Sequence, residues 1–158
     1  MRKFAANYII SDTGIFLKNG ILIAEENGTV LRYIDTADDL KEIAGLTFYN
    51  GILMTGFVFL QSNAPIESSE SDSPIYALVM RLTKELSLLS MHNLIDLGKK
   101  VQEQFPEMKI PEIMNEIQGI LQSNAGFIKE NLPEIFLLTG VDLPRLRFKP
   151  TTKLKKII

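Results

Sequence analysis

The chain has 158 residues, of which 46% are hydrophobic and 23% charged, with 17 basic and 19 acidic side chains. This is the composition of an ordinary soluble globular protein, and the near-balance of charge gives no general bias toward nucleic acid. A single histidine, His92, and the absence of cysteine exclude disulfides and any zinc site built from histidine or cysteine within one copy. Carboxylates leave an oxygen-only magnesium or calcium site open, although no EF-hand-like acidic spacing supports one.

Length and hydropathy predict one domain, residues 1–158, that buries about 68–70% of its unfolded surface. The chain opens with charged residues, but no sustained apolar stretch follows as in a signal peptide. No run approaches the roughly 20 apolar residues of a membrane helix. We therefore expect a cytoplasmic protein with no membrane partner.

Short strands are predicted in the N-terminal segment, residues 1–58. Asn27-Gly28 favours a type I′ hairpin turn, which needs positive φ at both central residues. A second pair, Asn50-Gly51, predicts another tight turn between two strands. The expected strands cover residues 4–10, 20–24, 29–34, 47–49 and 52–54, with a single helical turn at 38–44.

Residues 59–74 are predicted to form a loop, because their second half is polar, acidic and rich in serine. Residues 75–124 change to a helical period, which predicts three amphipathic helices. The first apolar stripe runs from Ile75 to Leu89. The second runs from Leu94 to Phe105 and ends at Pro106, and the third runs from Pro111 toward Asn124.

The C-terminal segment, residues 125–158, returns to strands. We expect a strand at 135–138, a turn at 140–144 and a final strand at 153–158 that alternates basic and apolar residues. Strands, helices and strands in separate blocks predict an α+β fold instead of a doubly wound sheet.

Two ends of the sequence carry a family likeness. The N-terminal match consists of Leu17, Gly20, Leu22, Asn27-Gly28 and residues 49–58, Tyr-Asn-Gly-Ile-Leu-Met-Thr-Gly-Phe-Val; the C-terminal match consists of residues 104–113 and 137–147. Together they resemble the metal-dependent amidohydrolase superfamily of the cytosine deaminase and chlorohydrolase type. The likeness covers roughly residues 1–67 and 92–158. Thr55 replaces the family's usual proline, and residues 130–134 replace its Gly-Lys-x-Pro-Gly turn.

The resemblance implies a fold from which the catalytic part is missing. The family's (β/α)8 barrel takes about 250 residues, more than the whole chain. The family's N- and C-terminal strands form a small β-sandwich beside that barrel. The resemblance therefore implies a β-sandwich or pseudo-barrel built by the terminal strands, with about three helices inserted between them.

The resemblance also marks positions where a metal site has been lost. In the family, two histidines spaced by one residue follow the Gly-Phe-Val strand, whereas this chain has Gln61 and Asn63 there. Amide oxygens are poorer ligands than imidazole for ions such as zinc. We therefore assign no metal ligand, no cofactor and no catalytic residue. The amides of Gln61 and Asn63 could instead bind a small ligand, but we favour the interpretation that they are remnants.

Other candidate residues have simpler structural interpretations, which we favour. His92 could be a general base, but its position suggests a helix cap or a surface residue. The carboxylates of Glu112 and Glu116, and those of Glu67, Glu70 and Asp72, could bind a cation, but solvation explains them more simply. The basic residues Arg145, Arg147, Lys149, Lys153, Lys155 and Lys156 could bind nucleic acid, but they also suit a charged edge strand, and we expect no nucleic-acid partner.

The leading hypothesis is a non-catalytic, metal-free relative of the amidohydrolases that acts as a binding or assembly module. Without the barrel, apolar surface needs another cover. The stripe Ile75–Leu89 is the candidate, within the chain or exchanged with a second copy. We therefore expect a homo-oligomer, most simply a two-fold dimer, while any small-molecule ligand stays unidentified. Two alternatives stay open: a residual hydrolase acting on C–N bonds through carboxylates, and an accessory chain to a homologue that has the barrel.

Overall fold

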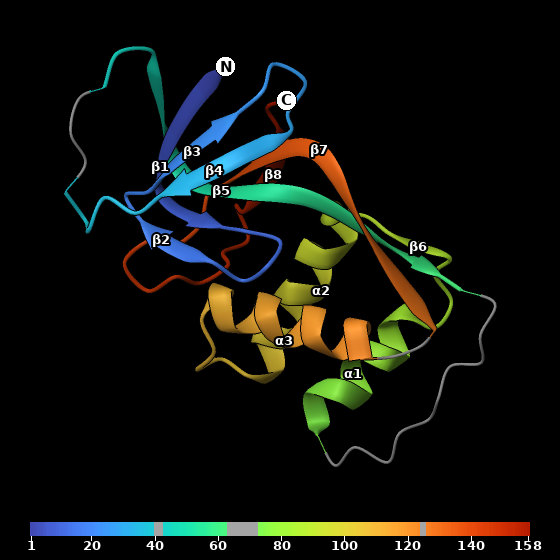
Figure 1. The fold of residues 1–158 in the computed structure, drawn as a ribbon. Helices are drawn as coiled ribbons and strands as arrows, with labels where there is room; N and C mark the ends of the chain where they lie inside the picture. Colours follow the sequence, from blue (N-terminus) through green and yellow to red (C-terminus); the bar gives the residue numbers. More distant parts are fainter. Residues whose placement is uncertain (40–42, 63–72, 124–125) are drawn as a thin grey trace. The chain divides into compact units, whose positions relative to one another are not determined.

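The computed structural model describes residues 1–39, 43–62, 73–123 and 126–158. Within these residues the chain has an α+β fold of eight strands and three helices, as the sequence predicts (Figure 1). The strands are β1 (Arg2–Ile10), β2 (Phe16–Lys18), β3 (Ile21–Ala24), β4 (Val30–Ile34), β5 (Leu46–Gln61), β6 (Leu88–Leu89), β7 (Phe127–Thr139) and β8 (Lys153–Lys156). The helices are α1 (Pro74–Thr83), α2 (Met91–Gln104) and α3 (Ile110–Ser123).

The chain divides into two compact units, which are described separately below. Unit 1 contains residues 1–56 and 131–158, and unit 2 contains residues 57–130. Strands β5 and β7 contribute residues to both units. The prediction of a single domain stays a prediction. None of the helices in the described residues has the length and apolar character needed to span a bilayer.

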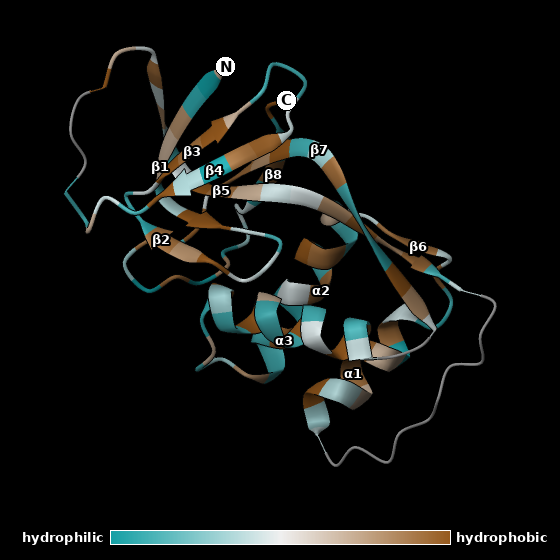
Figure 2. Cartoon of the chain, viewed as in Figure 1, coloured by the Kyte–Doolittle hydropathy of each residue, from teal (hydrophilic) through white to brown (hydrophobic). Residues whose placement is uncertain are grey.

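The strands of the two chain ends share one mixed sheet, in the order β4-β3-β1-β5-β7-β8, with β2 pairing to β1. Strand β1 runs parallel to β5 and antiparallel to β2 and β3. The most apolar of these strands is β3, which is brown along its length in Figure 2, and its four residues are buried. The N- and C-terminal segments therefore fold together, as expected.

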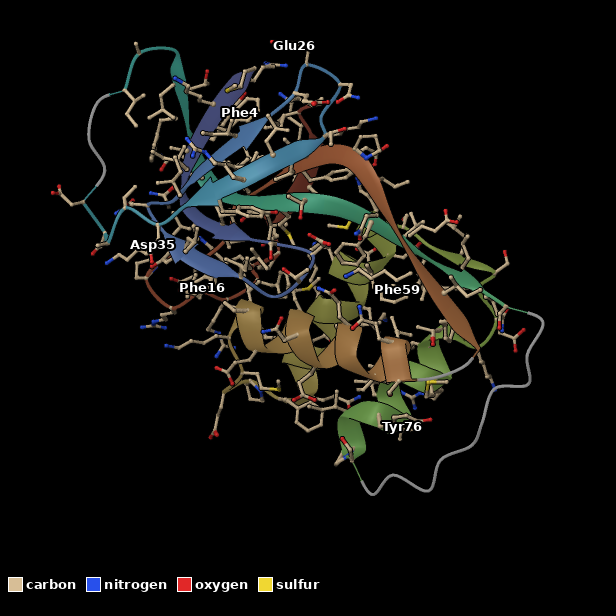
Figure 3. All side chains as sticks on the ribbon, viewed as in Figure 1. Phe4, Phe16, Glu26, Asp35, Phe59 and Tyr76 are labelled. Carbon is tan, nitrogen blue, oxygen red and sulfur yellow. The ribbon has the colours of Figure 1, made fainter. Side chains whose placement is uncertain are left out.

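The sheet of unit 1 curls until its distant strands meet. A Cβ added at Gly28, just before β4, would lie 2.2 Å from the carbonyl oxygen of Pro133 in β7. The Tyr33 hydroxyl of β4 donates a hydrogen bond to Thr55 Oγ1 of β5 at 3.3 Å. These contacts enclose one apolar core that draws on β1, β3, β5 and β7, in which Phe4 is labelled in Figure 3. Unit 1 is thus a pseudo-barrel formed by a single sheet.

The hairpin between β3 and β4 is confirmed, but its turn differs from the predicted type I′. Gly28 has φ +95°, whereas Asn27 is not among the described residues with positive φ. The Gly28 N–H donates to Glu25 O at 3.0 Å, and the Asn27 side chain accepts from the Thr29 N–H at 2.9 Å. One left-handed glycine is enough here, because a longer loop with an added bulge joins the strands.

The turn predicted at Asn50-Gly51 is wrong, because both residues lie inside the continuous strand β5. They form a bulge at which the register with β1 shifts between Ala6 and Tyr8. The Gly51 N–H donates to the Asn7 side chain at 2.7 Å, and Gly51 has φ +143°. The sequence pair signals positive φ, and a bulge uses that φ as readily as a turn does. The helical turn predicted at 38–44 includes residues 40–42, which lie outside the described residues.

Unit 2 combines the ends of β5 and β7 with β6 and the three helices. Helix α2 starts at a capping box between Ser90 and Asn93, and the helix ends before Pro106, as predicted. Helix α3 matches its predicted range within one residue at each end. The three helices contact one another, and each has a buried set of residues that is mostly apolar.

The first predicted helix is shorter than its apolar stripe, because α1 ends at Thr83. Leu88 and Leu89 instead form β6, in which Leu89 pairs with Phe59 and Leu88 with Leu60. Pairing with β5 thus overrides the helical period of these leucines. Within unit 2, α1 contacts α2 and α3, and the proposed role of this stripe as a cover stays a prediction.

Candidate functional site

Gln61 and Asn63, the positions at which the resemblance implies a lost metal site, are only partly described. Gln61 is the last residue of β5, and its backbone N–H donates to Ser87 O at 2.9 Å. Asn63 lies outside the described residues. Across residues 1–39, 43–62, 73–123 and 126–158, no group of three or more histidine, cysteine, aspartate or glutamate side chains is placed to hold a metal ion. This part of the chain therefore contains no carboxylate cluster of the kind that holds a metal ion.

Candidate acid–base residues of the sequence occupy helix surfaces. His92 is exposed on the first turn of α2, whereas the capping side chain is that of Ser90, which accepts from the Asn93 N–H at 3.2 Å. Glu112 and Glu116 are exposed on α3, as a solvated helix face requires. Glu67, Glu70 and Asp72 lie outside the described residues.

Lys153, Lys155 and Lys156 belong to strand β8, which is an edge strand of the sheet, whereas Arg145, Arg147 and Lys149 precede it in the chain. Lys153 and Lys155 are exposed, and Leu154 between them is half-buried. Lys156 forms a 3.2 Å ion pair with Glu134. This arrangement is what the edge-strand interpretation predicts, because charged side chains oppose pairing with another chain.

A hollow in unit 1 was not predicted from the sequence. It has a volume of about 540 Å³ and lies where the curled sheet brings β4 toward β7. Its lining comes from four separate segments: Asp12 and Thr13, residues 29–33, Thr55 and Gly56, and residues 131–133. Asp12 and Asn131, from the first and last of these segments, lie 119 positions apart in the sequence. No local pattern could therefore have indicated the site.

Hydrogen bonds join three residues that line this hollow, Tyr33, Thr55 and Asp12. The Tyr33 hydroxyl donates to Thr55 Oγ1 at 3.3 Å, and Thr55 Oγ1 donates to Asp12 Oδ1 at 3.2 Å. The Asp12 backbone N–H also donates to Thr55 Oγ1 at 2.9 Å. Thr55 is only 5% exposed, so these bonds satisfy a polar group that would be costly to bury alone. The resembled family has proline at the position of Thr55. A proline side chain has no hydroxyl and could make none of these three hydrogen bonds.

Burial in this wall raises the pKa of the Tyr33 hydroxyl above its ordinary value. The hydrogen bond with Thr55 acts in the opposite direction, and the charge of Asp12 adds to the rise. At neutral pH the hydroxyl is therefore protonated and able to donate its hydrogen bond.

A second feature is an apolar row on the sheet of unit 2. Phe57 and Phe59 are buried on one face of β5; Lys129 stands 4.6 Å from the centre of the Phe57 ring and donates to Gln118 of α3 at 3.0 Å. Figure 3 labels Phe59 on the side of β5 toward the helices. The alternate residues of these strands must then point to the opposite face.

That opposite face carries Leu88 of β6, Leu60 of β5 and Ile128 of β7, which we call the apolar row. Leu60 pairs directly with Leu88. Ser62 N–H donates to Gly126 O at 2.7 Å, which places Leu60 and Ile128 on neighbouring strands close to this bond. Leu88 is 46% exposed and Ile128 is 54% exposed, and β6 is brown in Figure 2. No described residue covers the row fully.

Comparison with known proteins adds no relative to this picture. No protein-family model, no curated protein and no solved structure matches the chain.

Proposed function

We infer that the chain is a non-catalytic, metal-free relative of the metal-dependent amidohydrolases that acts as an assembly module and forms a homodimer. The sharing of one core by the N- and C-terminal strands supports the relationship, since the resemblance implies that arrangement. The amide side chains at Gln61 and Asn63 support the loss of the metal site. The lack of cysteine suits the reducing cytoplasm, where we place the protein.

The apolar row is the observation that carries the assembly function. A sheet with helices on one face normally buries apolar side chains on that face and exposes polar ones on the other. Here Leu88 of β6 and Ile128 of β7 are exposed, and the half-buried Leu60 of β5 lies between them on the same face. Contiguous exposed apolar side chains indicate an interaction surface.

A second copy of the chain is the occupant that fits the row. The row runs across the sheet, and its side chains are of similar size and uncharged, so it can pack against itself about a two-fold axis. Two sheets packed in this way lie about 10 Å apart, a spacing that aliphatic side chains fill.

The energy of this contact is modest. Burying the remaining exposed half of Leu88 or Ile128 contributes about 1 kcal/mol each, so these four side chains from two rows contribute roughly 4 kcal/mol, and the less exposed Leu60 adds little. Association costs about 4–15 kcal/mol in lost freedom, and the contacts around the row must supply the remainder. The proposed dimer therefore depends most on Leu88 and Ile128, the exposed members of the row.

Sedimentation velocity of Ile128→Glu tests the proposal. Placing two like charges in the interface should convert a dimer at micromolar concentration into a monomer, because each buried carboxylate would lack a partner. Ile15→Glu is the matched control, since Ile15 is 42% exposed in unit 1 and outside the row. A wild-type protein that sediments as a monomer, or an Ile128→Glu protein that stays a dimer, would contradict the proposed function.

A further inference from the structure

The hollow of unit 1 meets the edge of strand β4 and not one of its faces. Tyr33 pairs with Leu22 and packs against the core of unit 1, whereas Arg32 pairs with Ile23 and lies on the opposite face of the sheet. Both residues nevertheless line the hollow, together with the rest of residues 29–33. A hollow on one face would be lined only by alternate residues of a strand. On this side its wall is therefore the backbone edge of β4.

Strand β4 is unpaired along this edge. It ends the order of strands in the sheet and pairs only with β3 among the strands that the structure describes. Apart from that ladder, residues 30–34 make no backbone hydrogen bond with another described residue. The register shift beside Leu31 leaves residues 32–34 in regular pairing with β3, so the edge is a regular strand there. Such an edge offers a row of N–H and C=O groups to an added strand.

The two edge strands that end the order of the sheet, β4 and β8, differ in charge. Strand β8 carries Lys153, Lys155 and Lys156, and charged side chains of this kind oppose pairing with another chain. Strand β4 carries a single charged residue, Arg32, among four apolar or aromatic ones. The edge that borders the hollow is therefore the one with less protection against strand addition.

The far wall of the hollow limits what can reach this edge. It comes from Thr55 and Gly56 of β5 and from residues 131–133 of β7. The volume of about 540 Å³ falls in the usual range for ligand sites, roughly 300–1,000 Å³. A single extended chain fits between the walls, whereas a second intact sheet would bring its further strands against β7. Because Pro133 has no N–H, β7 offers the side chains of Leu132 and Pro133 and not a second complete ladder.

Beyond the assembly function, we propose that this hollow binds an extended peptide segment of another protein, which adds to the unpaired edge of β4 as a further strand. A segment of about five residues matches the length of β4, since each strand residue rises about 3.3 Å. Backbone hydrogen bonds to β4 hold the segment, and its alternate side chains pack against Leu132 and Pro133. The site therefore recognises an extended backbone with apolar residues at alternate positions, and the binding involves no covalent step.

Isothermal titration calorimetry of the full chain with the peptide acetyl-Thr-Val-Thr-Val-Thr-amide tests this proposal. The peptide is uncharged, favours an extended backbone and places both valines on one face. Two control peptides carry N-methyl groups, one at both valines and the other at all three threonines. Because a strand turns alternate N–H groups toward its neighbour, at least one control should bind about tenfold more weakly than the parent peptide. No binding of the parent up to about 10 mM, or equal binding of all three peptides, would overturn the proposal.

Amide hydrogen exchange followed by mass spectrometry locates the parent peptide on the wild-type chain. With the peptide at about ten times its Kd, the amides of residues 30–34 that point away from β3 should exchange about tenfold more slowly, because only the unbound fraction exchanges. The amides of residues 153–156 at the charged edge should keep their rates. Unchanged exchange at residues 30–34 would overturn the proposal. Protection there in the peptide-free protein that grows with protein concentration would also overturn it, since a second copy would then occupy the edge.

Leu132→Ala tests the aliphatic wall. Leu132 is half-buried and lines the hollow, so shortening its side chain should weaken binding of the parent peptide about fivefold. Phe48→Ala is the matched control, because Phe48 is 47% exposed and lies outside the hollow; this variant should bind as the wild type does. If Leu132→Ala binds as tightly as the wild type, the peptide lies elsewhere and the proposal falls. Hydrogen exchange on the wild-type chain keeps the test decisive if Leu132→Ala fails to fold.

Discussion

Thr55 shows how one buried hydroxyl holds distant segments together. It is 5% exposed and accepts from the backbone of Asp12 and the side chain of Tyr33, residues that lie 43 and 22 positions away. It also donates to the Asp12 carboxylate. The buried polar side-chain atoms of the described residues all have partners, so the pseudo-barrel contains polar groups without leaving one unsatisfied.

Tyr33 makes the stability of the fold depend on pH. Since burial raises the pKa of its hydroxyl, the folded chain holds this proton more tightly than the unfolded chain. The contribution of Tyr33 to stability is therefore complete below the ordinary tyrosine pKa, about 10, and is lost as the pH rises through the higher folded-state value.

Urea unfolding between about pH 8 and pH 11 measures this effect. We expect the free energy of unfolding to fall more steeply above about pH 10 in the wild type than in Tyr33→Phe, which has no proton to lose. Parallel pH profiles for the two proteins would show that Tyr33 is not the group responsible.

At the scale of elements, the bulge in β5 depends on Gly51. Its φ of +143° disfavours any other residue, and a Cβ there would lie 2.5 Å from the Leu138 carbonyl oxygen. We expect Gly51→Ala to lower the free energy of unfolding by about 1–3 kcal/mol or more.

Gly119→Ala is the matched control, because Gly119 lies in α3 and a Cβ there would meet nothing within 4 Å. This change should stabilise the protein by about 0.5–1 kcal/mol, since alanine favours a helix. Urea unfolding with a common m-value measures both variants. If both alanines have the same effect, the bulge does not need glycine.

The sequence predicted those elements whose signals are local. The stripes of α2 and α3, Pro106 after α2 and the alternation of β8 all depend on neighbouring residues, and each element has close to its predicted range. Asn50-Gly51 was misread because its preference for positive φ does not distinguish a turn from a bulge. Leu88 and Leu89 were misread because their partner strand, β5, lies about 30 positions earlier in the sequence.

The candidate sites were less accessible to sequence analysis than the fold. The hollow needs Asp12, Tyr33 and Thr55 to meet, and that contact exists only after the sheet curls. The apolar row draws one residue from each of three strands, and two of its members belonged to predicted loop or helix. Residue type gave no sign of either feature, because threonine, tyrosine and leucine are common in any sheet.

For the whole molecule, the proposed loss of the metal site predicts the metal content. Protein purified without added ions should contain much less than one metal ion per chain by inductively coupled plasma mass spectrometry. The reason is chemical, since glutamine and asparagine hold such ions more weakly than the histidines that the resemblance implies. A stoichiometric ion that survives dialysis against a chelator would contradict the metal-free account and favour the residual hydrolase.

The same account treats the molecule as half of an assembly, with the apolar row of one copy against that of the next. Because the chain has no cysteine, single cysteines can be introduced at Leu60, Leu88 and Ile128 without a background reaction. Ile15→Cys, at an exposed position outside the row, provides the control.

Cross-linking with a short bis-maleimide at micromolar protein concentration is the most direct test of this central claim. We predict covalent dimers for at least one of Leu60→Cys, Leu88→Cys and Ile128→Cys, and only monomers for Ile15→Cys. If none of the three row variants cross-links, or if Ile15→Cys cross-links equally well, the row is not the interface and the assembly function is wrong.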